Sequence, residues 1–79
     1  MRYFFHLING HGLQEDKVGQ ELSDRSKVEL EVSRILTDVA RDELPHCHDG
    51  RIRVEVRTEE GKQVYNGSIV FETNWLETS

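Results

Sequence analysis

The stretch from Asp24 to Leu44 carries the most constraining pattern in the chain. Apolar side chains recur in it at steps of three and four residues and form two neighbouring rows, Val28, Val32, Ile35 and Val39 beside Leu36, Ala40 and Leu44. This spacing predicts an α-helix with one broad apolar stripe. Ser23 or Asp24 can cap its start, and Pro45 should stop it near Leu44.

A helix of this length spans roughly 30 Å and cannot bury its stripe alone, so the flanking segments must cover it. The chain has a single alanine, which means that the helix depends on packing more than on intrinsic propensity. With 79 residues there is room for one small core. We expect residues 1–79 to form one α+β domain, in which residues 72–79 could be a mobile or interface tail.

The segment before the helix indicates strands. Tyr3–Ile8 is short and rich in aromatic and branched residues, with apolar side chains on both faces. Asn9-Gly10 predicts a tight type I′ hairpin turn, which needs a positive φ at both central residues. Leu13–Leu22 has turn-forming residues within it and is expected to give one short, irregular edge strand.

The segment after the helix predicts a hairpin. Arg51–Thr58 alternates cleanly between apolar and polar residues, as a half-buried strand does. Glu59–Lys62 has the character of a turn. The next strand should place Tyr65, Ile69 and Phe71 on one face and Val64 and Val70 on the other. The expected fold is a two-layer α+β domain of order β-β-α-β-β, with one long helix on a mostly antiparallel sheet of three to four strands.

Charge and cysteine content narrow the function classes. The formal net charge of −5 opposes a general attraction to nucleic acid or to anionic membranes. The lone Cys47 cannot form an internal disulfide, which suits a reducing compartment. The apolar start of the chain is interrupted by His6 and lacks a cleavage site, and no run is long enough to span a membrane. We expect a soluble, cytoplasmic bacterial protein with no membrane partner.

The order of short motifs resembles a known family. The motifs are Arg2-Tyr3-Phe4-Phe5-His6-Leu7, Gly10, Gly12, Asp16, Gly19, Glu21-Leu22, Asp24, Gly50-Arg51, Glu55-Val56, Glu60-Gly61 and Val64. The chain is similar over nearly its whole length to small domains of unknown function from rhizobia and related alphaproteobacteria. Its Asp-x-x-Gly-x-Glu-Leu segment is the most specific part. The low alanine content of the helix and the tail with Trp75 depart from the family. The resemblance implies the fold order and a bacterial cytoplasmic setting, and it carries over no reaction, cofactor or catalytic residue.

A second similarity is looser. An N-terminal Arg-Tyr-Phe strand followed by turns and a helix is similar to the partial ribonuclease-H-like domain of HicB-type antitoxins. The glycine- and proline-marked strands of those antitoxins are not matched here. This similarity is one of topology only.

Four potential metal ligands stand in a row after the helix, His46, Cys47, His48 and Asp49. Zinc sites usually draw their ligands from two elements, so this run is more typical of a polar loop than of a metal site, which is a remote alternative.

Cys47 between two histidines could be a nucleophile, but a base with an orienting group and a pocket is not evident. Gly10-His11-Gly12 lacks the sequence of a phosphate loop. We therefore expect no catalytic, metal or cofactor site, and no enzymatic activity.

Arg51, Arg53 and Arg57 share one face of the strand after the helix and form a candidate basic face. With exposed aromatic residues beside it, such a face could bind nucleic acid or serve an antitoxin-like regulator, which is the alternative function. Glu55 lies within the patch, and arginines on a strand face normally pair with acids across strands. We do not expect nucleic-acid binding.

The apolar residues left over indicate self-association. The candidate interface comprises Phe4, Ile8, Val64, Val70, Trp75 and Leu76. One helix covers one face of a sheet, so the second apolar face of the first strand needs another cover. Trp75 and Leu76 either fold back onto the core or dock on a second subunit. We expect a non-enzymatic protein-interaction module that forms a homodimer, with its further protein partner unknown; alternatively, the tail or Leu13–Leu22 covers that face within one chain.

Overall fold

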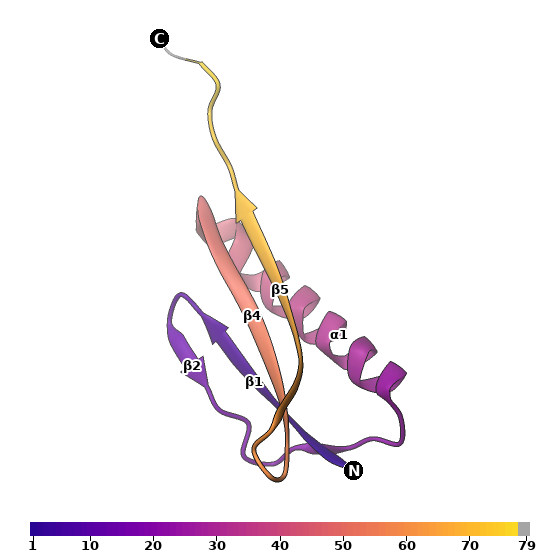
Figure 1. Cartoon of the computed structure of the whole chain (residues 1–79). Helices are drawn as coiled ribbons and strands as arrows, with labels where there is room; N and C mark the ends of the chain where they lie inside the picture. The colour runs from indigo at the N-terminus through magenta and orange to yellow at the C-terminus, as the bar shows by residue number, and fades with distance from the viewer. Residues whose placement is uncertain (78–79) are drawn as a thin grey trace.

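A computed structural model describes residues 1–77 and shows one long helix lying across one face of an antiparallel sheet (Figure 1). The elements in chain order are β1 (Arg2–Asn9), β2 (Gly12–Gln14), β3 (Gln20–Glu21), α1 (Arg25–Glu43), the 3-10 turn η1 (Leu44–His46), β4 (Asp49–Thr58) and β5 (Gln63–Glu72). The predicted α+β fold and its order are confirmed. The segment expected to be one irregular strand divides into β2 and β3, so the sheet has five strands rather than three or four.

The strands are ordered β2-β1-β4-β5, and β3 pairs with the other half of the same β1 edge as a short addition. All pairings are antiparallel. In β1–β4, Phe5 lies opposite Val56 and Leu7 opposite Val54. In β4–β5, Ile52 lies opposite Ile69 and Val54 opposite Gly67. The two long central pairings therefore bring apolar residues from distant parts of the chain to one face.

The helix begins and ends where its sequence predicts. The Asp24 carboxylate caps α1 by accepting a hydrogen bond from the Lys27 N–H at 3.1 Å. The most buried helical positions are spaced by four residues, and they are Val28, Val32, Leu36 and Ala40. The second row of the stripe, which includes Ile35 and Val39, packs at the border of the core.

A close approach between α1 and β5 sets the thickness of the domain. Ile52, Val54 and Val56 of β4 are at most 1% exposed beneath the helix. Opposite Val54, Gly67 of β5 leaves room for the helix, because a Cβ at Gly67 would lie 2.8 Å from Val32 Cγ1 and 3.2 Å from a Leu36 methyl. A side chain there would push the two layers apart.

Two local predictions from the sequence are wrong. Neither Asn9 nor Gly10 has a positive φ, so the first hairpin has no type I′ turn; Gly12 takes the positive φ of 111°, and the Asn9 side chain accepts the His11 N–H at 2.9 Å. In β5, the pairing shifts between Val56 and Arg57, which leaves Val64 as an extra residue. Val64 therefore lines the same cavity as Tyr65 instead of lying on the opposite face.

Within residues 1–77, no helix combines the length and the apolar character that crossing a membrane requires.

Candidate functional site

Figure 1 shows α1 against one face of the sheet. The pairing registers place most of the residues that the sequence singled out on the opposite face. The strand pairing places Arg51 beside Val70, Arg53 beside Ile8, and Arg57 beside Phe4. Phe4 and Ile8 are half-buried, whereas Val70 is 59% exposed. The candidate basic face and part of the candidate interface are therefore one surface.

Glu55 occupies the middle of this basic face. Its two carboxylate oxygens lie 3.4 Å from Arg53 and 3.5 Å from Arg57. The acid stands on the same strand, two residues from each arginine, and not across the sheet as expected. Because one carboxylate faces two guanidinium groups, the net positive charge of this patch is reduced. Arg51 forms no ion pair within the described chain.

The outer edge of β1 is closed by a carboxylate. Between the parts of β1 that pair with β2 and β3, the Phe5 N–H donates to Asp16 Oδ2 at 3.0 Å. Asp16 Oδ1 accepts the N–H groups of Val18 and Gly19, each at 3.0 Å. The Asp16 N–H in turn donates to His6 Nδ1 at 3.0 Å. Burial raises the pKa of Asp16, but the three backbone donors together hold that pKa below its usual range.

The glycine that follows Asp16 lets the segment fold over β1. Gly19 has a φ of 76°, and a Cβ there would lie 2.9 Å from the Phe4 ring and 3.0 Å from the Tyr3 carbonyl oxygen. The Arg2 guanidinium donates to the Val18 carbonyl at 2.9 Å. This segment therefore covers part of Phe4 within the chain, which was one of the two explanations for the second apolar face of β1.

The same contacts explain the Asp-x-x-Gly-x-Glu-Leu segment physically. Asp16 replaces a missing strand partner, and Gly19 supplies the turn. Glu21 then pairs with the terminal amine of Met1 at 2.8 Å, and Leu22 packs against the core. Its most specific residues thus have a structural role at the β1 edge.

The edge of β5 differs from that of β1. Within residues 1–77 no strand pairs with the outer side of β5, which is ten residues long. No charged side chain stands between Gln63 and Phe71, and there is no proline. Lysines, prolines and very short strands are the usual protection of such edges. The β5 edge therefore offers unpaired backbone groups along a long, uncharged strand.

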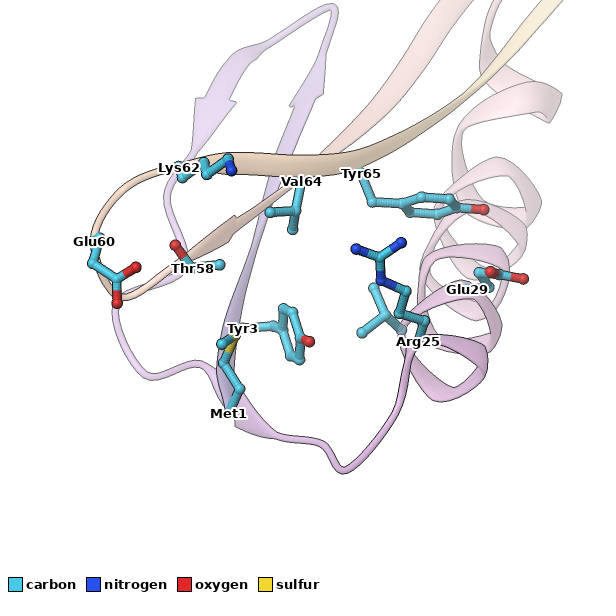
Figure 2. A pocket seen from close by; sticks show the side chains of 10 residues that line it. Met1, Tyr3, Arg25, Glu29, Thr58, Glu60, Lys62, Val64 and Tyr65 are labelled. Atoms are coloured by element: carbon cyan, nitrogen blue, oxygen red, sulfur yellow. The ribbon is translucent and has the colours of Figure 1, made fainter.

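A pocket of about 580 Å³ opens on the helix side of the sheet, near the start of β5 (Figure 2). Its lining residues come from β1, the start of α1 and the β4–β5 hairpin, and they are Met1, Tyr3, Arg25, Val28, Glu29, Thr58, Glu60, Lys62, Val64 and Tyr65. Figure 2 shows the Arg25 guanidinium reaching into the space beside Tyr65. The pocket has the volume of an ordinary ligand site.

The polar side chains that line this pocket form no side-chain hydrogen bond or ion pair within residues 1–77. Thr58 is 7% exposed, and its hydroxyl is the one buried side-chain polar atom there without a hydrogen bond. Neither Arg25 nor Lys62 takes part in an ion pair, and the same is true of the rim acids Glu29 and Glu60. Buried polar groups are normally satisfied, so an occupant that brings a polar atom would complete this site.

The tail beyond β5 does not fold back onto the core. Thr73 is held at its start by two hydrogen bonds to the His48 carbonyl, both at 2.8 Å. Figure 1 shows the chain after β5 running away from the sheet and the helix. Trp75 and Leu76, which lie in this part of the chain, are 90% and 92% exposed. Of the two roles considered for these residues, the core-plugging role is absent from this conformation.

The His46–Asp49 run forms a connection between η1 and β4. The exposed Cys47 thiol donates to the Glu43 carbonyl oxygen at 3.1 Å, at the end of α1. No group of three or more His, Cys, Asp or Glu side chains is placed to hold a metal ion in residues 1–77. Cys47 therefore helps to hold the connection between the helix and β4, through its bonds to the carbonyl oxygens of Glu43 and Leu44.

Sequence reasoning missed the pocket altogether. Its walls come from residues up to sixty-four positions apart, between Met1 and Tyr65. The one available signal was Thr58, which continues the apolar positions Ile52, Val54 and Val56 with a hydroxyl. A polar residue at the end of a buried row indicates a place where the core opens.

Comparison with protein families gives one match. Residues 2–70 match the model of a domain of unknown function, DUF6894. The chain belongs to this family. No curated protein and no solved structure matches it. The part shared with DUF6894 includes the helix, the sheet as far as Val70 of β5 and every pocket residue except Met1, whereas Trp75 and Leu76 lie beyond it.

Proposed function

We propose that this protein is a non-enzymatic interaction module that self-associates as a homodimer through the edge of β5. The observation that carries the proposal is the ten-residue edge of β5, which is uncharged as far as Phe71 and has no strand partner in residues 1–77. Two copies would pair antiparallel about a two-fold axis and join their sheets into one. Such β-augmentation derives its affinity from main-chain hydrogen bonds.

Side chains next to this edge support the same partner. Ser68 and Val70 are exposed on the open face, and Tyr65 is 39% exposed on the helix side. A neighbouring β5 would bury these side chains on the open face and on the helix side without bringing a charge into the centre of the interface. Phe4 and Ile8 lie further from this edge, so we assign them to a secondary surface for a protein partner.

The non-enzymatic part of the proposal rests on the chemistry of the pocket. Its lining contains no histidine or cysteine, and no two of its side chains form a hydrogen bond or ion pair that could join a nucleophile to its base within residues 1–77. Glu55 between Arg53 and Arg57 favours protein over nucleic acid as partner for the open face. A bacterial cytoplasmic setting, of the alphaproteobacterial type, remains a prediction from the sequence.

Sedimentation equilibrium tests the proposal. At tens of micromolar protein, a typical range for weak assemblies, we expect a mass of about twice the 9.2 kDa of one chain. A mass of one chain throughout that range would contradict self-association. Arg53→Glu tests the alternative: salt-sensitive nucleic-acid binding that this change abolishes would show that the basic face is the functional surface.

A further inference from the structure

The tail of the chain cannot reach the pocket of its own domain. Trp75 is three residues beyond the end of β5, which is a reach of roughly 10 Å. The pocket lies at the opposite end of β5, a distance of about 33 Å for a ten-residue strand. An occupant of the pocket that comes from this tail must therefore belong to another copy.

Antiparallel pairing of two β5 edges brings the tail of one copy to the pocket of the other. Pairing over the full strand places Glu72 beside Gln63 of the second copy, and Trp75 then lies near Glu60 in the hairpin that borders the pocket. A two-fold axis through such a pair is perpendicular to the joined sheet. Both helices, and both pockets, then lie on the same side of it.

Side-chain alternation along β5 would place Trp75 on the helix side of the sheet. Ile69 packs on the core, and Phe71 lies opposite Gly50 on the same face of the sheet. Because side chains alternate along a strand, pairing that continues past Glu72 turns Thr73 and Trp75 toward the helix side. That is the side on which the pocket opens.

We propose that Trp75 of one copy fills the pocket of the second copy, so that each pocket is completed across the dimer. The indole would pack on Tyr65 and Val64, and the Arg25 guanidinium is placed to lie over its face as a cation–π partner. The indole N–H would be available to the Thr58 hydroxyl or to Glu60. This assignment rests on the proposed β5 dimer, and its key residue lies outside the matched DUF6894 range.

The intrinsic fluorescence of the protein reports on this contact directly, because Trp75 is the only tryptophan in the chain. We expect the emission to shift to the blue, and acrylamide quenching to fall, as protein concentration rises through the dimer dissociation constant. A dimer in which Trp75 stays fully quenchable would overturn the pocket assignment and leave the β5 dimer in place. Blue-shifted emission from protein that sedimentation shows to be monomeric would also overturn it.

Variants separate the two proposals. Trp75→Ala should weaken the dimer at least about tenfold, as the loss of a buried aromatic anchor does. Arg25→Gln should reduce the concentration-dependent blue shift, whereas the matched change Arg41→Gln, at the far end of α1, should not. An unchanged shift in Arg25→Gln and in Tyr65→Ala would show that Trp75 binds elsewhere. A chain that stays monomeric at all concentrations would overturn the dimer itself and, with it, the pocket assignment.

Discussion

The outer edge of β1 is covered by other parts of the chain, whereas the outer edge of β5 is open. The β1 edge is closed by two short strands and, between them, by the Asp16 carboxylate, which accepts three backbone N–H groups. The β5 edge is longer, carries no charge before Glu72 and has no strand partner in residues 1–77. Both edges belong to one sheet, but they differ in length, in charge and in what the chain places beside them.

This difference shows where the sequence protects against unwanted pairing. An unpaired strand edge invites association, and natural proteins usually block it. Here the segment from Asp16 to Leu22 serves that purpose at β1, whereas residues 73–77, which follow β5, form no such cover. We infer that pairing at β1 is prevented and that pairing at β5 is allowed.

The largest effect is expected from opening the closed edge. Asp16→Ala removes the acceptor of three N–H groups and should lower the free energy of unfolding by about 2–4 kcal/mol, since unsatisfied donors are costly. Urea denaturation measures this. The matched control is Asp42→Ala, an exposed helical aspartate for which we expect a change below about 0.5 kcal/mol. Equal losses in both variants would mean that Asp16 does not hold the edge.

The turn at the same edge should be nearly as sensitive. Gly19→Ala places a methyl group within 3.0 Å of Phe4 and of a backbone carbonyl, at a positive φ. We expect a loss of about 2 kcal/mol from strain and steric overlap. Gly10→Ala is the control, because its φ is not positive and no atom lies within 4 Å of the added position. The shift in the thermal midpoint should therefore be large for the first variant and small for the second.

At the open edge, a charge should act more on association than on folding, although Ser68 also lies opposite Arg53 of its own sheet. Ser68→Lys places lysines close together across the two-fold axis of a β5 pair, where like charges repel. We expect the dimer dissociation constant to rise at least about tenfold, which is roughly 1.4 kcal/mol. Sedimentation of Ser68→Lys beside Ser33→Lys, a matched change on the exposed side of α1, measures the difference. If both variants dimerise as the parent chain does, β5 is not the interface.

The smallest effect concerns pH. Because the pKa of Asp16 in the folded state lies below its ordinary value of 3.8, its stabilising contribution is complete above that value and is lost as pH falls through the folded pKa. The stability difference between the parent chain and Asp16→Asn should therefore shrink between pH 6 and pH 3. Urea midpoints at these two pH values test it. A difference that stays constant would show that the Asp16 charge is not involved.

The sequence predicted elements whose pattern is local. The helix from Asp24 onward follows from its apolar spacing and its cap, and β4 follows from strict alternation through Ile52, Val54 and Val56. Strict side-chain alternation predicted the wrong face for Val64. The reason is that a bulge depends on the partner strand and cannot be recognised from the pattern of apolar and polar residues in β5 alone.

The candidate sites were less predictable for a related reason. Asp16 was recognised as part of a motif, but its role depends on the Phe5 N–H, which comes near only when the edge of β1 is built. The pocket is assembled from three distant segments, so no spacing in the chain reveals it. The exposure of Trp75 depends on where β5 ends, whereas its role depends on a partner.

Gly67 fixes the register of β5, and this has a consequence for how copies of the chain assemble. With Val32 and Leu36 lying against the one position of β5 that has no side chain, a slip of β5 by two residues would press Tyr65 or Ile69 into the helix. The strand therefore has one possible alignment within its own domain. Because the β1 edge is closed, each copy has one open edge, and two copies that pair through β5 leave none. Growth should therefore stop at a closed pair instead of continuing into a fibre.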